Sequence, residues 1–352
     1  MKDVIKNLEI LSTLNGTPGN EKQISQEIHK LSLPFVDELF YDNLGSLITK
    51  KGIDGPKVLI GAHLDEIGLM VTKITKEGFI KFQTVGAWFS QVMLGQEWQI
   101  TTSKGIVYAV TGSKPPHLIP LDQRSKAIEI ESMFLDVGVS NYEDAVKLGI
   151  KPGDMITPSA RFRILGDGKH IVGKAFDNRI GSVIILEILK QLSQTPNIVY
   201  GAHTIQEEVG SRGAKTTAYM VQPDLAIAID SGIANDVPGG EAQEQSLGKG
   251  PQILLYDTGL IGHPALRQFV IKVANELNIP YQEALLARGS TDGSQFSLAH
   301  SGAPTIAITI PTRYLHSHTS MIHLDDVTNT IKLVKAVIEK LDQRTVETIT
   351  FG

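Results

Sequence analysis

Two adjacent acids, Glu207 and Glu208, follow a run of residues, NIVYGAHTI (197–205), that is typical of a buried strand. Neighbouring carboxylates repel each other, and removing each from water is costly. Nearby divalent cations would offset that repulsion and keep both groups ionised. Because successive residues of an extended chain point in opposite directions, only one of the two can face a metal. We predict that Glu208 binds a metal and that Glu207 faces a water molecule as its general base.

Histidines and carboxylates recur at the corresponding places of other predicted elements. In open α/β sheets, ligands bind at the carboxyl ends of the strands, so these residues should meet at one edge. Taken singly, each has a simpler interpretation, such as a hydrogen-bonded core histidine, a helix cap, a turn residue or a solvated strand end. All five segments would need such an interpretation at once. Besides the glutamates, the residues are His63 and Asp65 after strand 57–62, Asp177 before helix 179–193, Asp230 after strand 224–229, and His316 and His318 after strand 304–310.

The donor types indicate a metal site without sulfur, since the chain has no cysteine. Imidazole and carboxylate ligands suit Zn²⁺ or Co²⁺, and also Mn²⁺. Two histidines and three carboxylates suffice for two metals that share one bridging carboxylate, an arrangement that serves hydrolysis. Asp65 can hydrogen-bond the imidazole of His63 and fix its tautomer. Spacing alone does not choose between His316 and His318.

The composition is that of an ordinary soluble protein and narrows the classes of partner. The 352 residues are 41% hydrophobic and 20% charged, with a formal net charge of −5, so no basic field favours nucleic acid. The first residues form an amphipathic pattern broken by charges, unlike a signal peptide, and no apolar run reaches the length of a membrane span. We expect a cytoplasmic protein.

The pattern of elements predicts an α/β domain interrupted by a β-domain. Helices are expected at 1–14 and 20–32, followed by a hairpin over 36–50. Short strand-like runs separated by Gly and Pro then fill residues 68–163, which is typical of a barrel or a sandwich. After residue 170, strands and helices alternate, which implies a sheet covered on both faces. We expect a catalytic domain of residues 1–67 and 164–352 and an inserted domain of residues 68–163.

With these residues identified, the chain resembles the M42 family of metalloaminopeptidases, which includes tetrahedral aminopeptidases and bacterial glutamyl aminopeptidases. The resemblance spans nearly the whole chain and rests on several segments in the family's order. They are GAHLDEIGLMV, TGSKPPHL, IKPGDMITP, GKAFDNRIG, QEEVGSRGA, AIAID, GSTDG and PTRYLHSH. The implied fold is a mixed sheet with helices on both faces, as in zinc peptidases, with an inserted β-barrel. In the family the barrel makes dimer contacts, and dimers assemble into tetrahedral dodecamers.

The resemblance also implies a role for each residue. His63, Asp177 and Asp230 would hold one metal, and Asp177 would bridge to a second metal held by Glu208 and His316. Glu207 matches the general base, and Asp65 the residue that orients His63. Many members read HSPxE where this chain has His318 and Ser320, but the first histidine is retained. His117, in the segment GSKPPHL, matches a loop that can lie near a neighbouring subunit's active site, although the adjacent prolines favour a plain turn.

The implied activity is release of N-terminal residues, acidic or neutral, from short peptides. Arg288 is the candidate cation for an acidic side chain, although a solvated loop arginine is an equally simple interpretation, and the apolar stretch ILLYDTG (253–259) weakens the acidic choice. Two other classes compete. A glycoside hydrolase could use paired carboxylates, but sugar sites favour aromatic platforms and the chain has only two Trp. A non-catalytic metal-binding scaffold would have no use for Glu207 as a base.

Overall fold

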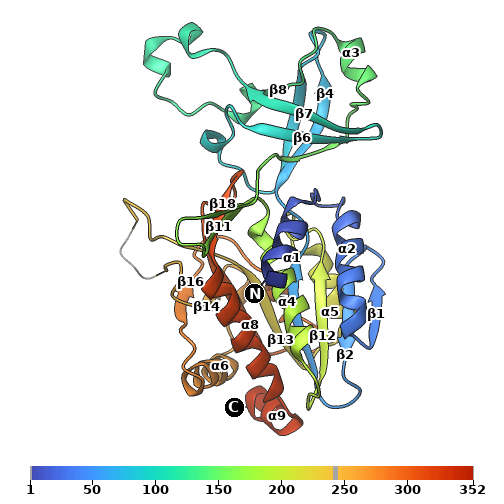
Figure 1. Ribbon diagram of the computed structural model, residues 1–352, viewed down its shortest axis with the longest axis vertical. Coiled ribbons are helices and arrows are strands. Elements are labelled where there is room, and N and C mark those ends of the chain that lie inside the picture. The colour runs from blue at the N-terminus through green and yellow to red at the C-terminus, as the bar shows by residue number, and fades with distance from the viewer. Residues whose placement is uncertain (1, 241–244, 352) are drawn as a thin grey trace.

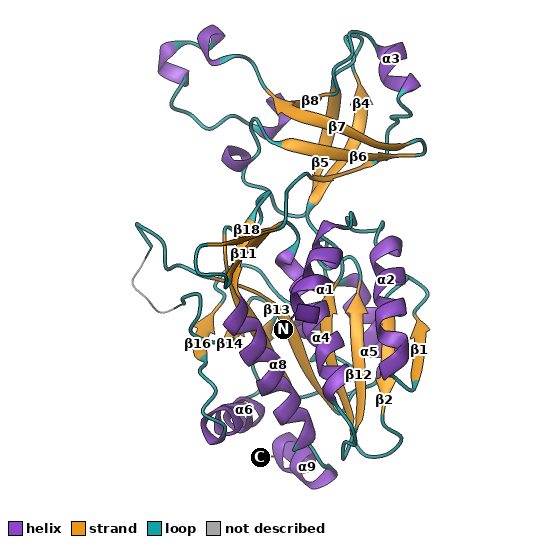
Figure 2. Cartoon of the chain, in the orientation of Figure 1, coloured by secondary structure: helices purple, strands orange, loops and turns teal. Residues whose placement is uncertain are grey.

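The computed structural model describes residues 2–240 and 245–351, and shows a large sheet flanked by helices with a separate small barrel beside it (Figures 1 and 2). The sheet has the strand order β1-β2-β12-β3-β13-β17-β18-β11-β10, and β14 branches from β17 to pair with β15 and β16. The strands are β1 (Glu38–Tyr41), β2 (Leu47–Lys51), β3 (Lys57–His63), β10 (Arg163–Leu165), β11 (His170–Gly173), β12 (Ile198–Thr204), β13 (Leu225–Ile233), β14 (Gln252–Asp257), β15 (Leu260–Ile261), β16 (Gln282–Leu285), β17 (Thr305–Arg313) and β18 (Ser320–His323).

The centre of the sheet is parallel, because β12, β3, β13 and β17 pair side by side in one direction. Helices cover both of its faces. One face packs against α1 (Lys2–Thr13), α2 (Lys22–Ser32), α4 (Phe176–Gln191), α6 (Pro264–Glu276), α8 (Leu324–Glu339) and α9 (Gln343–Phe351). The other face packs against α5 (Arg212–Val221) and α7 (Gly293–Phe296). This confirms the predicted mixed sheet with helices on both faces.

Side-chain size differs between the two faces and sets how closely the helices approach. Along β13, Leu225, Ile227 and Ile229 fill the face under α4, whereas Ala226 and Ala228 point toward α5 and α7. Gly61 of β3 lies on the same small-residue face, and a Cβ there would overlap the ring of Phe296 from α7. The small residues therefore let the short α7 lie directly on the strands, next to their carboxyl ends.

The inserted region is a closed six-stranded barrel with the order β4-β5-β8-β7-β6-β9. Its strands are β4 (Gly68–Ile74), β5 (Ile80–Val85), β6 (Glu97–Thr102), β7 (Gly105–Gly112), β8 (Phe134–Asp136) and β9 (Met155–Pro158), with the helix α3 (Tyr142–Lys147). Trp98, Leu69 and Ile156 belong to its buried core, which is separate from that of the sheet. The short strand-like runs of residues 68–163 therefore form a barrel rather than a sandwich. The domain boundaries at 67/68 and 163/164 stay a prediction.

Several short elements were not expected from the sequence. Within residues 155–165, β9 belongs to the barrel, whereas β10 returns to the large sheet beside β11. Both β11 and β18 are only four residues long, so their alternation is too brief to stand out locally. The short 3-10 helices are η1 (Leu33–Phe35), η2 (Ser90–Val92), η3 (Pro116–Leu118), η4 (Leu121–Gln123) and η5 (Ile130–Ser132). Within the described ranges, no helix is long and apolar enough to cross a membrane.

Candidate metal centre and active site

The predicted ligands meet at the carboxyl ends of the parallel strands. His63 is the last residue of β3, and Glu207 and Glu208 follow β12. Asp230 lies within the C-terminal half of β13, and His316 lies in the loop after β17. Segments far apart in the sequence are thus brought to one sheet edge by parallel pairing, as strand order in an α/β sheet requires.

Asp177 lies between two histidines. Its Oδ1 is 3.2 Å from Nε2 of His63, and its Oδ2 is 3.4 Å from Nε2 of His316. Nε2 of His63 is also 3.7 Å from Oδ1 of Asp230, and Nε2 of His316 is 3.6 Å from Oε1 of Glu208. Two of the groups that these side chains form share one carboxylate: His63, Asp177 and Asp230, and Asp177, Glu208 and His316. A third group, His63, Glu207 and Glu208, overlaps with both.

The backbone turns sharply where these ligands are presented. Ala175, Gln206 and His316 have φ values of 54°, 56° and 55°, in the left-handed region that residues other than glycine seldom adopt. Ala175 immediately precedes α4, Gln206 precedes the glutamate pair, and His316 is itself one of the clustered residues. Residues held in this region cluster at functional sites, where the surrounding structure imposes the conformation.

The first turn of α4 assigns different roles to two neighbours. Asp177 and Asn178 have non-helical backbone angles and are joined by a cis peptide bond. Oδ1 of Asn178 accepts a hydrogen bond from the amide of Gly181 at 3.1 Å, and its Nδ2 donates to the carbonyl of Ile229 at 2.8 Å. Asn178 therefore caps the helix, which leaves the carboxylate of Asp177 free to face the two histidines.

Asp65 supports the site mainly through the backbone of the glutamate pair. Its two carboxylate oxygens accept hydrogen bonds from the amides of Glu207 and Glu208, each at 3.0 Å. Nδ1 of His63 lies 3.0 Å from the carbonyl oxygen of Asp65 and 3.5 Å from its Oδ1. One buried side chain thus joins the loop after β3 to the loop after β12, and it lies beside the imidazole that it was expected to orient.

The electrostatics of the site reflect crowding of buried acids. Burial, reinforced by the charge of Asp177, raises the pKa of Glu208 to about 7. Burial likewise raises the pKa values of Glu207 and Asp230 well above the ordinary range. Burial would lower the pKa of His316, but its hydrogen bond with Asp177 and the charge of Glu208 raise it to about 9. A group of oxygen and imidazole donors that favours added positive charge suits divalent cations such as Zn²⁺.

A cavity of about 470 Å³ opens over this group. The carboxylate of Glu207 lies in its wall, with Oε1 3.3 Å from the hydroxyl of Ser211 and Oε2 3.9 Å from Nε2 of His63. Arg288, Leu286 and Ile233 also line the cavity. The cavity is large enough for an amino-acid side chain. It adjoins both paired ligand groups and also Glu207, which belongs to neither of them.

Comparisons with known proteins identify relatives of this chain over most of its length. The model of the M42 glutamyl aminopeptidase family matches residues 45–333. The chain is 35% identical to the putative aminopeptidase FrvX of Escherichia coli K12, over 95% of this chain and 96% of that protein. The chain belongs to the M42 aminopeptidase family.

Solved structures of this family share the whole fold. A TET aminopeptidase from a marine sediment Thaumarchaeota archaeon has a TM-score of 0.97 and 40% identity, covering 99% of both chains. The TET1 peptidase of Pyrococcus horikoshii, described as able to assemble into a tetrahedron or a large octahedral shell, has a TM-score of 0.86 and 33% identity, covering 96% of this chain and 100% of that one. The family resemblance seen in the motifs is thereby confirmed, and the chain is a peptidase of the aminopeptidase class.

The remaining predicted residues of this M42 chain lie in different surroundings. His318 is packed edge-on against the barrel tryptophans Trp98 and Trp88, with ring centroids 4.2 and 5.5 Å apart, so it does not join the ligand groups. Nδ1 of His316 instead lies 3.0 Å from the carbonyl oxygen of Ala87 in the barrel. Arg288 lines the cavity, whereas His117 is exposed on η3 and is not one of the residues lining the cavity.

Asp292 was missed by the sequence analysis as a site residue. It lies at the start of α7, its carboxylate accepts a hydrogen bond from the hydroxyl of Thr204, and burial raises its pKa to about 6. Its charge acts on both Glu207 and Asp230. The sequence offered a signal for Asp292, because it is the acid of the GSTDG segment, one of the segments that carry the family resemblance. No role had been assigned to this acid.

A buried ion network, also missed, holds the loops that carry His63 and Asp177. Its members are Lys174, Glu66 and Arg179, whose side chains are all at least 98% buried. Nζ of Lys174 lies 2.6 and 2.8 Å from the two carboxylate oxygens of Glu66. Nη2 of Arg179 is 3.5 Å from Oε1 of Glu66, and its guanidinium also donates to the carbonyls of Leu11, Leu14, Gly16 and Leu64. Removing one partner would leave an uncompensated buried charge.

We therefore expect Lys174→Met to lower the free energy of unfolding by about 3 kcal/mol, because Glu66 would keep its buried charge without its closest partner. Urea unfolding of the wild type and the variant measures this. The double variant Lys174→Met, Glu66→Gln removes the stranded charge and should be less destabilised than the sum of the two single variants. Additive effects of the two substitutions would contradict the coupling.

Proposed function

We propose that this M42 chain is a dinuclear metal-dependent aminopeptidase that releases N-terminal residues from short peptides. The observation that supports it is Asp177, whose two carboxylate oxygens face two different histidines, each with a further acid beside it. His63, Asp177 and Asp230 would hold one metal ion, and Asp177, Glu208 and His316 the other. Zn²⁺ or Co²⁺ fits these nitrogen and oxygen donors best, and Mn²⁺ also fits.

Two such ions, when bound, supply Lewis-acid polarisation of the scissile carbonyl and activation of the attacking water. Glu207 then acts as the general base: it takes a proton from the water and returns it to the leaving amine. Its carboxylate lines the cavity and is not shared between the two ligand groups, and Ser211 lies within hydrogen-bonding distance of one oxygen. Asp65 positions the base by accepting its backbone N–H, which fixes the turn that carries both glutamates.

The cavity also suits a free peptide N-terminus. A positively charged α-amino group entering it meets a wall of carboxylates, so it gains an acceptor that a blocked N-terminus cannot use. This favours removal of single N-terminal residues over internal cleavage.

Glu207→Gln should lower kcat by at least about a hundredfold, because the amide keeps the shape of the side chain but cannot accept the proton. The measurements are hydrolysis of aminoacyl-p-nitroanilides and metal content by mass spectrometry. The variant should retain the metal content of the wild type, wild-type activity should be lost on chelation and return with Zn²⁺ or Co²⁺, and N-acetylated peptides should not be cleaved. Unchanged turnover with metal bound would show that Glu207 is not the base, as in a scaffold, and chelator-insensitive cleavage of a glucan would favour a glycosidase.

We further propose that Arg288 sets the side-chain preference. Its guanidinium is exposed at the cavity wall, and none of the described acids forms an ion pair with it. A planar guanidinium can bind an incoming carboxylate with two hydrogen bonds, which favours N-terminal Glu or Asp. Leu286 and Ile233 in the same wall provide apolar contact for the stem of that side chain or for a neutral residue such as Leu.

Arg288→Ala should lower kcat/KM for Glu-p-nitroanilide by about ten- to a hundredfold, since a charge-assisted bidentate contact is lost. Hydrolysis of Leu-p-nitroanilide should change little, and Arg288→Lys should fall between the wild type and the alanine variant for the Glu substrate. An unchanged ratio of Glu to Leu hydrolysis in Arg288→Ala would exclude this residue as the selector.

A homo-oligomer built from dimers, up to a tetrahedral dodecamer, is the assembly we propose. The outer face of β7 exposes Ile106, Tyr108 and Val110, which are 44%, 65% and 45% accessible. Three apolar side chains in a row on one barrel strand form a surface that a second copy could cover. The similar TET1 peptidase of Pyrococcus horikoshii forms closed shells. A role for His117 near the active site of a neighbouring subunit depends on this assembly and stays a prediction.

Tyr108→Glu should shift the protein toward smaller species in sedimentation velocity, because burying an unpaired carboxylate in an apolar contact is unfavourable. Ile53→Glu is the matched control. Ile53 is 93% exposed in the connection between β2 and β3 of the large sheet, so this substitution should leave the sedimentation profile unchanged. A wild-type protein that sediments as a monomer would contradict the proposed assembly.

A further inference from the structure

A second group of metal-binding side chains lies apart from the active-site cluster, at the edge of the large sheet. Asp167 occupies the turn between β10 and β11, His170 begins β11, and His323 ends β18 just before α8. His170 and His323 are direct partners across the antiparallel pair β11–β18, so their side chains lie on the same face. None of these residues takes part in the two groups around Asp177.

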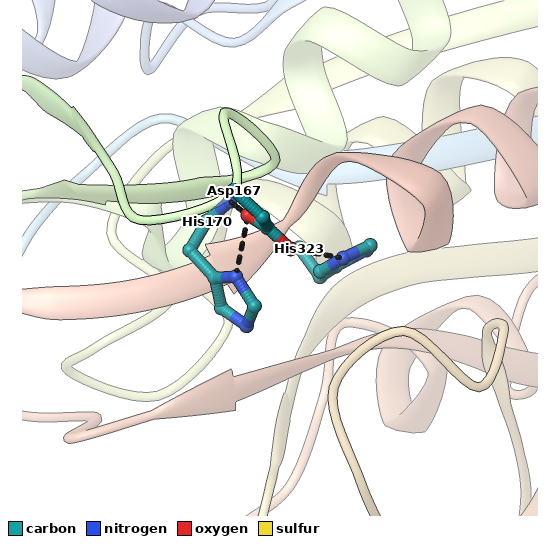
Figure 3. A group of neighbouring side chains, drawn as sticks. All are labelled: Asp167, His170 and His323. Carbon is teal, nitrogen blue, oxygen red and sulfur yellow. Dashed lines mark hydrogen bonds and ion pairs between the residues drawn. The ribbon is translucent and has the colours of Figure 1, made fainter.

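Figure 3 shows the carboxylate of Asp167 between the two imidazoles, with a dashed line to each. Oδ1 of Asp167 is 3.0 Å from Nδ1 of His170, and its Oδ2 is 4.0 Å from Nε2 of His323. The two imidazole rings are nearly perpendicular, at 84°, with centroids 4.9 Å apart. One donor atom from each residue lies within 4.8 Å of the other two, so small side-chain rotations suffice to place all three around one ion.

The turn and the strand pair fix two of the donors before any ion binds. Oδ1 of Asp167 accepts hydrogen bonds from the amides of Lys169 and His170, at 2.9 and 3.3 Å, which leaves Oδ2 directed at His323. The His323 side chain is nine-tenths buried, and the described residues provide no hydrogen bond to its Nε2. Its ring packs against Gly248, where an added Cβ would lie 3.5 Å from the imidazole.

We propose that Asp167, His170 and His323 bind one divalent transition-metal ion, Zn²⁺ first among them, at a site separate from the catalytic centre. Two imidazoles and one carboxylate are a donor set that Zn²⁺, Ni²⁺ and Cu²⁺ accept, whereas Mg²⁺ and Ca²⁺ prefer oxygen alone. Three protein ligands leave a position for water, as expected for a site that is partly open to solvent.

The neighbouring charges are compatible with a cation. The charge of the neighbouring Lys169 ammonium is offset by Asp325, with Nζ and Oδ2 2.7 Å apart. The same Oδ2 lies 4.0 Å from Nδ1 of His323, which now accepts the amide hydrogen of Asp325 at 3.2 Å. When Nε2 binds a metal, Nδ1 carries the proton, and this carboxylate is placed to accept it. Metal binding would thus replace the hydrogen bond from the amide of Asp325 to Nδ1 of His323 by one from Nδ1 of His323 to the carboxylate of Asp325.

Such an ion would tie the β10–β11 turn to the start of α8. The turn belongs to the segment through which the chain returns from the barrel to the large sheet, whereas α8 follows β18 near the C-terminal end of the chain. Its expected effect is therefore on the stability of this edge, and not on the chemistry at Asp177. The inference is independent of the proposed aminopeptidase mechanism.

The test compares the full-length wild type, His170→Ala and the control His300→Ala, each stripped of metal and equilibrated with buffered Zn²⁺. His300 is an exposed histidine in none of the candidate metal groups. Mass spectrometry should find one equivalent of zinc fewer per subunit in His170→Ala than in the wild type and in His300→Ala. Loss of one of three ligands should weaken binding at this site at least about a hundredfold. The catalytic kcat/KM should be the same in all three proteins.

Asp167→Asn provides a second variant on the exposed turn, and thermal unfolding without metal checks that each variant folds. In the wild type, zinc should raise the Tm by an increment that both His170→Ala and Asp167→Asn lack. Equal zinc content in the wild type and His170→Ala, or the same zinc-dependent rise in Tm in all variants, would overturn the site. Because the readout is a difference of one equivalent, failure of the proposed two-metal centre would appear separately, as a lower count in every protein.

Discussion

Mutual repulsion of acids is the constraint around which the site is arranged. Six buried or nearly buried carboxylates converge at the ends of three parallel strands: Asp65, Asp177, Glu207, Glu208, Asp230 and Asp292. Two like charges about 4 Å apart repel by about 4 kcal/mol at an effective dielectric constant of 20. The two imidazoles of His63 and His316 do not offset such a concentration of acids. Burial, together with the charges of neighbouring acids, raises the pKa values of Glu207, Glu208 and Asp230. The proposed pair of divalent ions would supply the missing positive charge.

Acidic groups that repel one another stay close together only if a rigid backbone holds them in place. The parallel strands fix the positions of the loops, and left-handed residues such as Gln206 turn the chain so that the acids face inward. Asp65 joins two of these loops by accepting two backbone amides, while Glu66, the next residue, binds Lys174 and Arg179 in the segment that leads to Asp177. A buried ion network is not by itself stabilising, since desolvation offsets much of its attraction. Here it fixes one loop against another, which favours a role in positioning.

The sequence was sufficient where a local pattern carries the information and insufficient where only the fold brings residues together. Buried strands that end in a histidine or an acid indicated the edge occupied by His63, Glu208 and Asp230, and the alternation of strands and helices predicted the fold class. The contact of Asp292 with Thr204, and that of His170 with His323, joins residues far apart in the chain, so no periodicity reports either one. The short strands β10, β11 and β18 were missed because three or four residues carry too little alternation, and their order in the sheet is decided by tertiary packing.

The choice between His316 and His318 shows that the inserted barrel takes part in building the site. Both histidines lie in one loop two residues apart, and the local spacing does not show which of them is the candidate metal ligand. In the fold, His318 packs edge-on against Trp88 and Trp98, whereas Nδ1 of His316 faces the carbonyl of Ala87, which also belongs to the inserted region. A carbonyl acceptor holds the proton on Nδ1 and leaves Nε2 directed at Asp177 and Glu208, the tautomer that a metal ligand requires. The chain leaves the sheet for the barrel directly after His63 and Asp65, and the barrel in turn orients the second histidine of the centre. The insertion and the sheet are therefore parts of one site, because neither alone fixes both imidazoles.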